Sequence, residues 1–355
     1  MKILIIALSG IGDLIMALPM INILKKNYPN SKIDFLVAPR GTKELLENQP
    51  FVNKIFVLKS QSVKDLFLNK DVRGLITQLK LNNYDIAITI HPSQGIFSAF
   101  LMKLIDAKIR IQHKYNFKLF KNVSWFLTYS PNIEDTHSVY ENLNLIKCLK
   151  VQYNKEEIEY NYKLTKDEKN FSNNFWKENS LDKYFIVGLH PGTGRDQPWR
   201  RWNLNNWVKL IEAINNNFRG KIKFLIFLGP GEIEYEKYFK DIDNVLIVKN
   251  FPLKKVISII SKCNFFISND SGLAHIASLF KIPQIVLFKG GPDPKHTRPF
   301  LNKAVVITPK NYIPYYRPYY GFIKAYEKIR KKENEIEIND VYLAFQEYYK
   351  KLTKF

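Results

Sequence analysis

The chain is poor in cysteine, in arginine and in long hydrophobic runs. Its two cysteines, Cys148 and Cys263, have no partner at the spacing of a metal site, so neither a disulfide framework nor structural zinc is expected. The apolar run at residues 3–8 is too short for a signal peptide, and no stretch reaches the roughly 18–20 apolar residues of a membrane-spanning helix. These absences favour a protein of the reducing cytoplasm.

Acidic residues are also few, because 33 aspartate and glutamate residues stand against 54 lysine and arginine residues, a net charge of +21. This balance favours an anionic partner such as a nucleic acid, a phospholipid surface or a phosphorylated substrate. Only ten of the basic residues are arginine, and the lysines are dispersed along the chain. Nucleic-acid surfaces usually cluster arginine with aromatic residues, so we assign part of the excess to a lysine-rich coding bias and expect no nucleic acid.

What the sequence has in abundance is an alternation of short β-branched runs with helical patterns, which indicates parallel strands in doubly wound sheets. The runs are almost continuously apolar, as expected when both faces of a sheet are covered. Expected strands cover residues 2–8, 32–38, 54–58 and 84–90 in the first half, and 184–190, 222–228, 244–248, 265–268, 283–288 and 304–308 in the second. Expected helical patterns include residues 14–27, 42–48, 64–82, 94–105, 140–150, 205–217, 253–263 and 272–280.

A polar, tyrosine-rich stretch at residues 151–164 divides the two halves, and Thr165 with Glu168 forms a capping-box signature directly after it. We therefore expect an α/β protein with two Rossmann-like, doubly wound domains that face a central cleft and bind ligands at the carboxyl ends of their strands. The domains are expected at residues 1–155 and 165–320. A helical segment at residues 321–355 could pack back on the N-terminal domain.

Two small-residue loops in the second half each follow an expected strand. One is His190-Pro191-Gly192-Thr193-Gly194-Arg195 with Arg200-Arg201-Trp202 behind it, and the other is Asn269-Asp270-Ser271-Gly272-Leu273-Ala274-His275. Such loops place unpaired backbone N–H groups where a helix dipole also favours an anion. Three of the ten arginines lie within seven residues, and arginine suits bidentate phosphate contacts. The pair of loops predicts a site for a nucleotide diphosphate, with a solvated surface turn as the alternative.

Several single residues near these loops have two interpretations each. Asp270 is expected to act as a helix N-cap only, and His275 is either a core group or a ligand contact. Glu232, after Gly229-Pro230-Gly231, either accepts hydrogen bonds from a ribose or base or supplies a favourable charge at a helix start. The glycine-rich loop at residues 288–294 is a further candidate for the same site.

Near the N-terminus, Gly10-Ile11-Gly12-Asp13 follows the first expected strand as a dinucleotide fingerprint would. The third glycine of that fingerprint is replaced by Ile15, and the second strand ends without the acidic residue that binds a ribose. The cofactor signal is therefore weak. What remains is Asp13, a carboxylate at a strand–helix junction, which is either a catalytic group or a helix cap.

Taken together, these motifs resemble those of the glycosyltransferase family 9 heptosyltransferases of lipopolysaccharide core assembly. The matching pieces are Gly12-Asp13 with Pro19, His190-Pro191-Gly192 with Arg200-Arg201-Trp202, Gly229 with Glu232, and Asp270-Ser271-Gly272-Leu273 with His275. The resemblance implies a GT-B fold, in which an N-terminal domain binds the acceptor and a C-terminal domain binds the nucleotide sugar. It also implies inverting, metal-independent transfer, commonly from ADP-heptose to a lipopolysaccharide core, with no cofactor.

By the same resemblance, Asp13 is the general base. Thr193, Gly194, Ser271, Gly272 and Leu273 belong to the diphosphate loops, Glu232 contacts the ribose, and His275 lies in the nucleotide loop. Arg200 stands where the family commonly has a lysine on the phosphates, and Arg201 is the neighbouring candidate. The basic segment at residues 114–121 has no clear counterpart.

The lysine excess would then suit an anionic lipopolysaccharide acceptor and the inner leaflet of the membrane. The expected location is the cytoplasm, or the cytoplasmic face of the inner membrane as a peripheral protein. Two alternatives stay open from the sequence. One is an NAD(P)-dependent oxidoreductase with two Rossmann domains, and the other is a basic, non-catalytic binder of nucleic acids or membrane surfaces.

Overall fold

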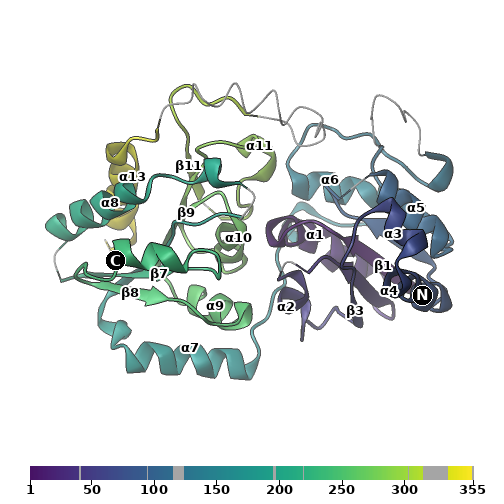
Figure 1. Ribbon diagram of the computed structural model, residues 1–355, viewed down its shortest axis with the longest axis horizontal. Helices are drawn as coiled ribbons and strands as arrows, with labels where there is room; N and C mark the ends of the chain where they lie inside the picture. The colour runs from purple at the N-terminus through teal and green to yellow at the C-terminus, as the bar shows by residue number, and fades with distance from the viewer. Residues whose placement is uncertain are drawn as a thin grey trace. The chain divides into compact units, whose positions relative to one another are not determined.

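The computed structural model describes residues 1–353, apart from residues 40, 94, 115–123, 195–196, 219, 303 and 315–334 (Figure 1). The described residues divide into two compact units, one at Met1–Lys163 and one that begins at Leu164. Each unit is a parallel sheet with helices on both faces, so each contains the doubly wound arrangement that the alternation of strands and helices predicts.

The first unit has the strand order β3-β2-β1-β4-β5, and every neighbouring pair is parallel. Because the order reverses at β1, the switch point lies between β1 and β4, where ligands of such sheets bind. The core of the sheet is apolar on both faces, since β1 and β4 are buried almost throughout. The strands are β1 (Lys2–Ala7), β2 (Lys32–Val37), β3 (Lys54–Val57), β4 (Ile86–Thr89) and β5 (Ile109–Ile111).

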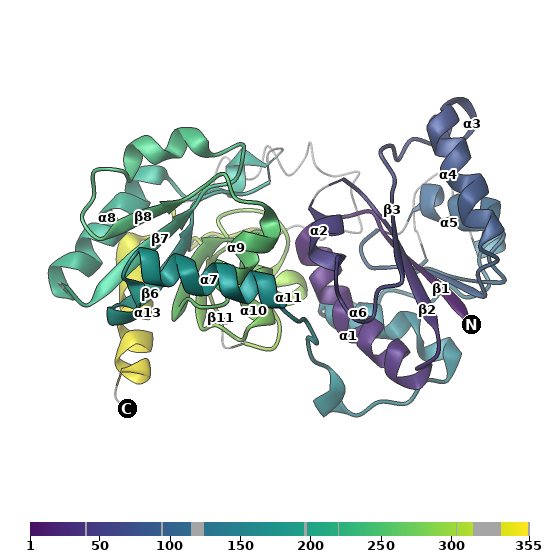
Figure 2. The same ribbon diagram turned by 90° about the horizontal axis from the view of Figure 1, so that it is seen from below.

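Helices cover the two faces of this sheet in two groups. Helices α1 (Ile11–Asn27) and α6 (Ser138–Leu145) pack together, and α3 (Val63–Leu68), α4 (Lys70–Leu81) and α5 (Ile96–Leu104) lie on the opposite face (Figure 2). The short α2 (Thr42–Leu46) follows β2. The helical region expected at 64–82 is two helices, because the Asn69 side chain accepts hydrogen bonds from the N–H groups of Asp71 and Val72 and starts α4 there.

The second unit has the order β11-β10-β9-β6-β7-β8, also fully parallel. This is the doubly wound order 3-2-1-4-5-6 with its switch point between β6 and β9. The strands are β6 (Phe185–His190), β7 (Ile222–Phe227), β8 (Val245–Val248), β9 (Phe265–Asn269), β10 (Gln284–Leu287) and β11 (Ala304–Ile307). The helices are α7 (Lys166–Glu178), α8 (Leu204–Asn217), α9 (Leu253–Ile260), α10 (Gly272–Leu279), α11 (Pro294–Thr297) and α13 (Ile338–Leu352).

The predicted capping box at the start of α7 is present, since Thr165 accepts from the Glu168 N–H and Glu168 accepts from the Thr165 N–H. The polar stretch at residues 151–164 forms hydrogen bonds with side chains of the first unit. Asn22 donates to the carbonyl of Glu159 at 3.0 Å, and Gln49 donates to the carbonyl of Lys163 at 2.9 Å. The chain therefore leaves the first unit at residue 163.

Of the helical segment expected at residues 321–355, residues 321–334 lie outside the described residues, and the helix that follows them is part of the second unit. Helix α13 lies beside α8 and belongs to the core of the second unit, where Val341 and Phe345 are fully buried (Figure 1). The Trp202 indole N–H also donates to the carbonyl of Ile336 at 2.9 Å. The aromatic faces of α13 explain this placement, because Phe345 meets the rings of Phe218 and Phe265. In the described part of the chain, no helix has the length and apolar character of a membrane span.

Candidate functional site

Asp13 lies at the carboxyl end of the first sheet, where its order reverses. It is the third residue of α1 and only 7% exposed, and its Oδ2 atom accepts a hydrogen bond from the Gly10 N–H at 3.2 Å. The loops after β1 and β4 are joined there, since the Ser93 hydroxyl donates to the Ser9 hydroxyl at 2.9 Å. The helix-capping interpretation of Asp13 is thus partly met, and its carboxylate sits in the position of a ligand-binding group.

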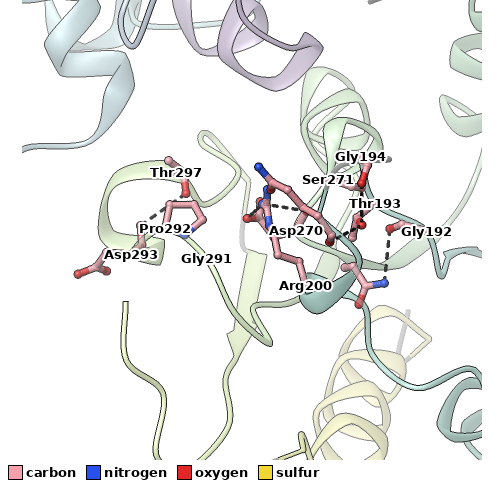
Figure 3. Close-up of polar contacts among 12 residues, drawn as sticks. Gly192, Thr193, Gly194, Arg200, Asp270, Ser271, Gly291, Pro292, Asp293 and Thr297 are labelled. Carbon is pink, nitrogen blue, oxygen red and sulfur yellow. Dashed lines mark hydrogen bonds and ion pairs between the residues drawn. The ribbon is translucent and has the colours of Figure 1, made fainter. Parts of the chain in front are cut away.

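In the second unit, the candidate residues gather at the carboxyl ends of four neighbouring strands. His190 ends β6, Glu232 follows β7, residues 270–272 follow β9, and the glycine-rich loop follows β10. The two phosphate loops predicted from the sequence therefore lie side by side at the switch point (Figure 3). Asn269 binds them together, because its amide donates to the carbonyl of Pro191 at 2.7 Å and accepts from the Trp202 N–H at 3.0 Å.

Asp270 is not the N-cap of α10, contrary to the expectation. Its carboxylate forms a buried ion pair with the guanidinium of Arg200, which also donates to the Asp270 carbonyl at 3.1 Å and to the Gln197 side chain (Figure 3). A carboxylate next to a buried guanidinium is held there because an unpaired buried charge is costly. Arg200 is thereby oriented by Asp270 and shares its charge with it.

The loop after β10 closes over Arg200. Gly291 has φ +129°, and a Cβ atom at this position would lie 3.1 Å from Arg200 Nε. Both the backbone conformation and the close approach therefore favour glycine here. Asp293 then caps α11 by accepting the Lys295 N–H at 2.8 Å. The close approach of Gly291 to Arg200 is consistent with the expectation that this loop belongs to the same site.

Arg201 points to a different part of the site. Its Nε donates to the Thr193 hydroxyl at 3.1 Å, its Nη1 donates to the Tyr235 hydroxyl at 2.7 Å, and its guanidinium lies over the Tyr235 ring. The Thr193 hydroxyl in turn donates to the carbonyl of Gln197 at 3.2 Å. Arg201 thus brings positive charge to the loop that holds Thr193 and Gly194.

His190 joins the remaining candidates. Its Nδ1 lies 2.9 Å from the Ser271 hydroxyl, and its Nε2 lies 3.3 Å from Glu232 Oε2. The Glu232 carboxylate also accepts the Gly229 N–H at 2.9 Å. Burial raises the pKa of Glu232, but the charge and hydrogen bond of His190, the Gly229 N–H and Arg201 outweigh it and hold the pKa below its usual value. Glu232 is thus a buried, ionised acceptor.

Gly192 lies directly against this carboxylate. A Cβ atom built on Gly192 would fall 1.7 Å from Glu232 Oε1, which no side chain could tolerate without displacing Glu232. At Gly194, by contrast, a Cβ would meet nothing within 4 Å. Of the two glycines of this loop, Gly192 is the one whose missing side chain is required by its neighbours.

The other predicted residues have mixed outcomes. Gly272 and Leu273 are the first two residues of α10, whose N-terminus faces the site, and His275 is buried one turn further along. Arg195 lies outside the described residues, as do residues 115–121 of the basic segment. No role was predicted for His190, Asn269, Tyr235 or Gln197, although His190 and Asn269 are the first residues of the two predicted phosphate loops. Among the residues that the structure describes, no group of three or more His, Cys, Asp or Glu side chains is placed to hold a metal ion.

Comparison with known proteins decides the family. Residues 72–329 match the model of glycosyltransferase family 9 (heptosyltransferase). The chain belongs to glycosyltransferase family 9. Membership confirms that this protein is a glycosyltransferase and decides against an oxidoreductase and against a non-catalytic binder.

Bacterial heptosyltransferases are among the relatives of this glycosyltransferase. It is 27% identical over 315 residues to lipopolysaccharide heptosyltransferase 3 of Escherichia coli (strain K12). The aligned region covers 85% of this chain and 86% of the relative. It is 26% identical over 327 residues to lipooligosaccharide heptosyltransferase 2 of Haemophilus ducreyi, with 86% and 88% covered.

Solved structures share the fold of this glycosyltransferase. The glycosyl transferase family 9 structure from Veillonella parvula has a TM-score of 0.71 at 21% identity and covers 94% of this chain and 90% of that one. The structure of E. coli heptosyltransferase WaaC with ADP has a TM-score of 0.67 at 18% identity and covers 93% and 100%. With two parallel α/β units and these neighbours, the predicted GT-B fold class is confirmed.

Proposed function

We propose that this glycosyltransferase moves a heptose from ADP-heptose to the core of lipopolysaccharide, with inversion at the anomeric carbon and without a cofactor. The proposal is supported by relatives named lipopolysaccharide heptosyltransferases and by a heptosyltransferase structure with ADP. The observation that carries it is the convergence of the two phosphate loops at the switch point of the second sheet, beside the ionised Glu232.

In this proposal the second unit binds the donor. The diphosphate lies at the N-terminus of α10, near Ser271, Gly272 and Leu273, where N–H groups and the helix dipole favour an anion. The loop of Thr193 and Gly194 contacts it from the other side, with Arg201 as the nearby cation. Glu232 accepts hydrogen bonds from the ribose, and the Arg200–Asp270 pair fixes the loop shape. His275 stays a candidate in the nucleotide loop.

Asp13 is the proposed general base. Its carboxylate takes the proton of the acceptor hydroxyl while the acceptor oxygen attacks the anomeric carbon. The bond from that carbon to the β-phosphate oxygen breaks, and ADP leaves with the electron pair. Base catalysis of this kind contributes roughly 10²–10⁴-fold, and stabilisation of the leaving diphosphate by N–H groups and arginine supplies a further electrostatic part.

The donor is tested by thermal unfolding with ADP, GDP and UDP. A ligand that binds only the native state stabilises it by about 2.7 kcal/mol at 100 times its Kd. We therefore expect ADP to raise the Tm of the protein more than GDP or UDP does. A larger effect of GDP or UDP would refute the adenine assignment. Transfer with retention, seen by NMR of the product anomer, would refute inversion.

The base is tested by Asp13→Asn, which should lower kcat by at least ~100-fold and leave ADP affinity unchanged. The matched control is Asp71→Asn, because Asp71 is also a carboxylate in the first turn of a helix, α4, and is exposed. Near-normal turnover of Asp13→Asn would remove Asp13 from the mechanism.

We also propose that the anionic inner leaflet is a partner, contacted through an aromatic surface of the first unit. Trp125 is 77% exposed and stacks on Phe126, which meets Phe100, and Phe100 meets the exposed Phe67 of α3. The neighbouring Leu68 is 66% exposed. Exposed aromatic rings suit the headgroup region of a bilayer, and the exposed Lys64 and Lys70 lie within three residues of Phe67 in the chain.

This surface is tested by sedimentation with phosphatidylglycerol vesicles. Trp125→Ser with Phe67→Ser should lower the bound fraction several-fold, whereas Leu343→Ser, an exposed leucine of the second unit, should not. Equal binding of both variants would refute this surface as the contact.

A further inference from the structure

His190 is buried at the carboxyl end of β6, and both nitrogens of its ring are engaged. One faces Ser271 at 2.9 Å and the other faces Glu232 at 3.3 Å, although these residues lie 81 and 42 positions away in the chain. No role of its own was predicted for His190. The ring stands between the two ends of the proposed donor site, the diphosphate end at Ser271 and the ribose end at Glu232.

The chemistry of the partners fixes the hydrogen bond on one side. An ionised carboxylate only accepts hydrogen bonds, so Nε2 carries the hydrogen that points to Glu232. The same carboxylate accepts the Gly229 N–H and lies against the bare backbone of Gly192. Glu232 is thus held from three sides, and His190 is the only side chain among these three contacts.

On the other side, His190 changes what Ser271 does. Ser271 is the N-cap residue of α10, where serine normally turns its hydroxyl onto the N–H of the second or third helical residue. Here the Ser271 side chain makes no capping hydrogen bond and meets His190 Nδ1 instead. The first N–H groups of α10 are therefore not covered by the residue that would ordinarily cover them.

We infer that His190 is a positioning residue that keeps α10 uncapped for the donor diphosphate and holds Glu232 for the ribose. Its Nδ1 retains the Ser271 hydroxyl, which leaves the N-terminal amides of α10 to bind phosphate oxygens. Its Nε2 fixes the direction of the Glu232 carboxylate. This inference rests on the proposed nucleotide-sugar function and assigns one imidazole to both ends of its donor.

Two substitutions separate the two contacts. The amide of His190→Asn reaches the place of Nδ1, so it keeps Ser271 and loses Glu232. The amide of His190→Gln reaches the place of Nε2, so it keeps Glu232 and releases Ser271 to cap α10. Each variant is the control of the other, because both replace the ring by a neutral amide in the same buried place.

The readout is a pair of affinity ratios measured by titration calorimetry with ADP, AMP and 2′,3′-dideoxy-ADP. The preference for ADP over AMP reports the β-phosphate, and the preference for ADP over dideoxy-ADP reports the ribose hydroxyls. His190→Gln should lower the first ratio about fivefold and leave the second, since one hydrogen bond contributes about 1 kcal/mol. His190→Asn should do the reverse.

A rescue sharpens the phosphate arm. In the His190→Gln background, Ser271→Ala removes the hydroxyl that would cap α10, so the preference for ADP over AMP should recover. A merely structural role of His190 would weaken all three ligands by one factor and give no recovery, and that result overturns the inference. Circular dichroism and Tm of each variant confirm that the fold is retained.

The experiment separates this inference from the proposed function. If ADP binds wild type and the ratios do not change in the variants, only the role of His190 falls. If wild type prefers GDP or UDP, the adenine assignment falls, and the ratios taken with that nucleotide, its monophosphate and its dideoxy form decide on His190. If no nucleoside diphosphate binds, both fall.

Discussion

The guanidinium of Arg200 donates to both the backbone carbonyl and the carboxylate of Asp270, which lies 70 residues away in the chain. This double contact joins the loop after β6 to the loop after β9, the two loops on either side of the switch point. Position 200 is therefore a structural anchor of the site as well as a phosphate candidate, and its effects on folding and on binding are linked.

Asp270→Ala should lower the free energy of unfolding by about 3–5 kcal/mol, because it leaves the Arg200 charge buried without its carboxylate. The measurement is chemical denaturation, with Asp293→Ala as control. Asp293 caps α11 at a less buried place, so its loss should cost about 1 kcal/mol. Equal effects of the two substitutions would contradict the anchoring role of Asp270.

Gly192→Ala should weaken nucleotide binding at least tenfold in calorimetry, because the new Cβ forces the Glu232 carboxylate away from its place. The thermodynamic check is a double-mutant cycle with Glu232→Asp, whose shorter side chain makes room for the methyl group. The two substitutions should be strongly non-additive, since they share one contact.

The control for this glycine is Gly74→Ala in α4, where a Cβ meets nothing within 4 Å. That substitution tests the general effect of replacing a helical glycine and should stabilise the fold by up to about 1 kcal/mol. Unchanged nucleotide affinity in Gly192→Ala would show that Glu232 can move freely, contrary to its three contacts.

The Glu141 carboxylate should make stability depend on pH in the acid range. Burial raises its pKa, but the His113 ring, whose Nε2 lies 3.4 Å from Glu141 Oε2, and the N–H groups of Thr136 and Glu134 outweigh burial and lower the pKa from 4.5 to about 2. A carboxyl whose pKa is lowered on folding adds stability above the unfolded value, and this stability is lost as pH falls towards the folded value.

Glu141→Gln removes that contribution. The difference in unfolding free energy between wild type and Glu141→Gln should therefore be constant above pH 5 and should shrink between about pH 4.5 and about pH 2. Urea denaturation at several pH values measures it. A difference that stays constant down to pH 2 would contradict the lowered pKa.

Phe345→Ala should cost about 3–5 kcal/mol of stability, because it empties a fully buried place on α13 next to Phe218 and Phe265. Leu343→Ala on the same helix is the matched control, since Leu343 is 51% exposed and its loss should cost little. If both variants unfold alike, α13 is not part of the core.

The sheets were predictable from the sequence because their strands are apolar on both faces. Ten of the strands lie within two residues of the expected ranges, from β1 to β11. The exception is β5, a three-residue edge strand with Arg110 in its middle, which has too little apolar pattern to be seen. The place of α13 was also beyond the sequence, because an amphipathic helix does not show which core its apolar face will cover.

The loops of the site were found because glycine, serine and arginine gathered after apolar runs. The contacts between the residues of these loops were not predicted. Asp270 read as an N-cap because the pattern around α10 is local, whereas its partner Arg200 is remote in the chain. His190 was passed over for the same reason, since both of its partners come from other strands. The residue types at the ends of the strands predicted the kind of ligand, but they did not predict which side chains of the site contact one another.

The placement of α13 has a consequence for synthesis on the ribosome. Residues Met1–Lys163, which hold the whole sheet of the first unit, can fold while the rest of the chain is still being made. The second unit lacks Val341 and Phe345 from its core until α13 at residues 338–352 has been made. A nascent chain that stopped before α13 would therefore carry a folded first unit and a second unit with an exposed apolar face, which chaperones and proteases would recognise.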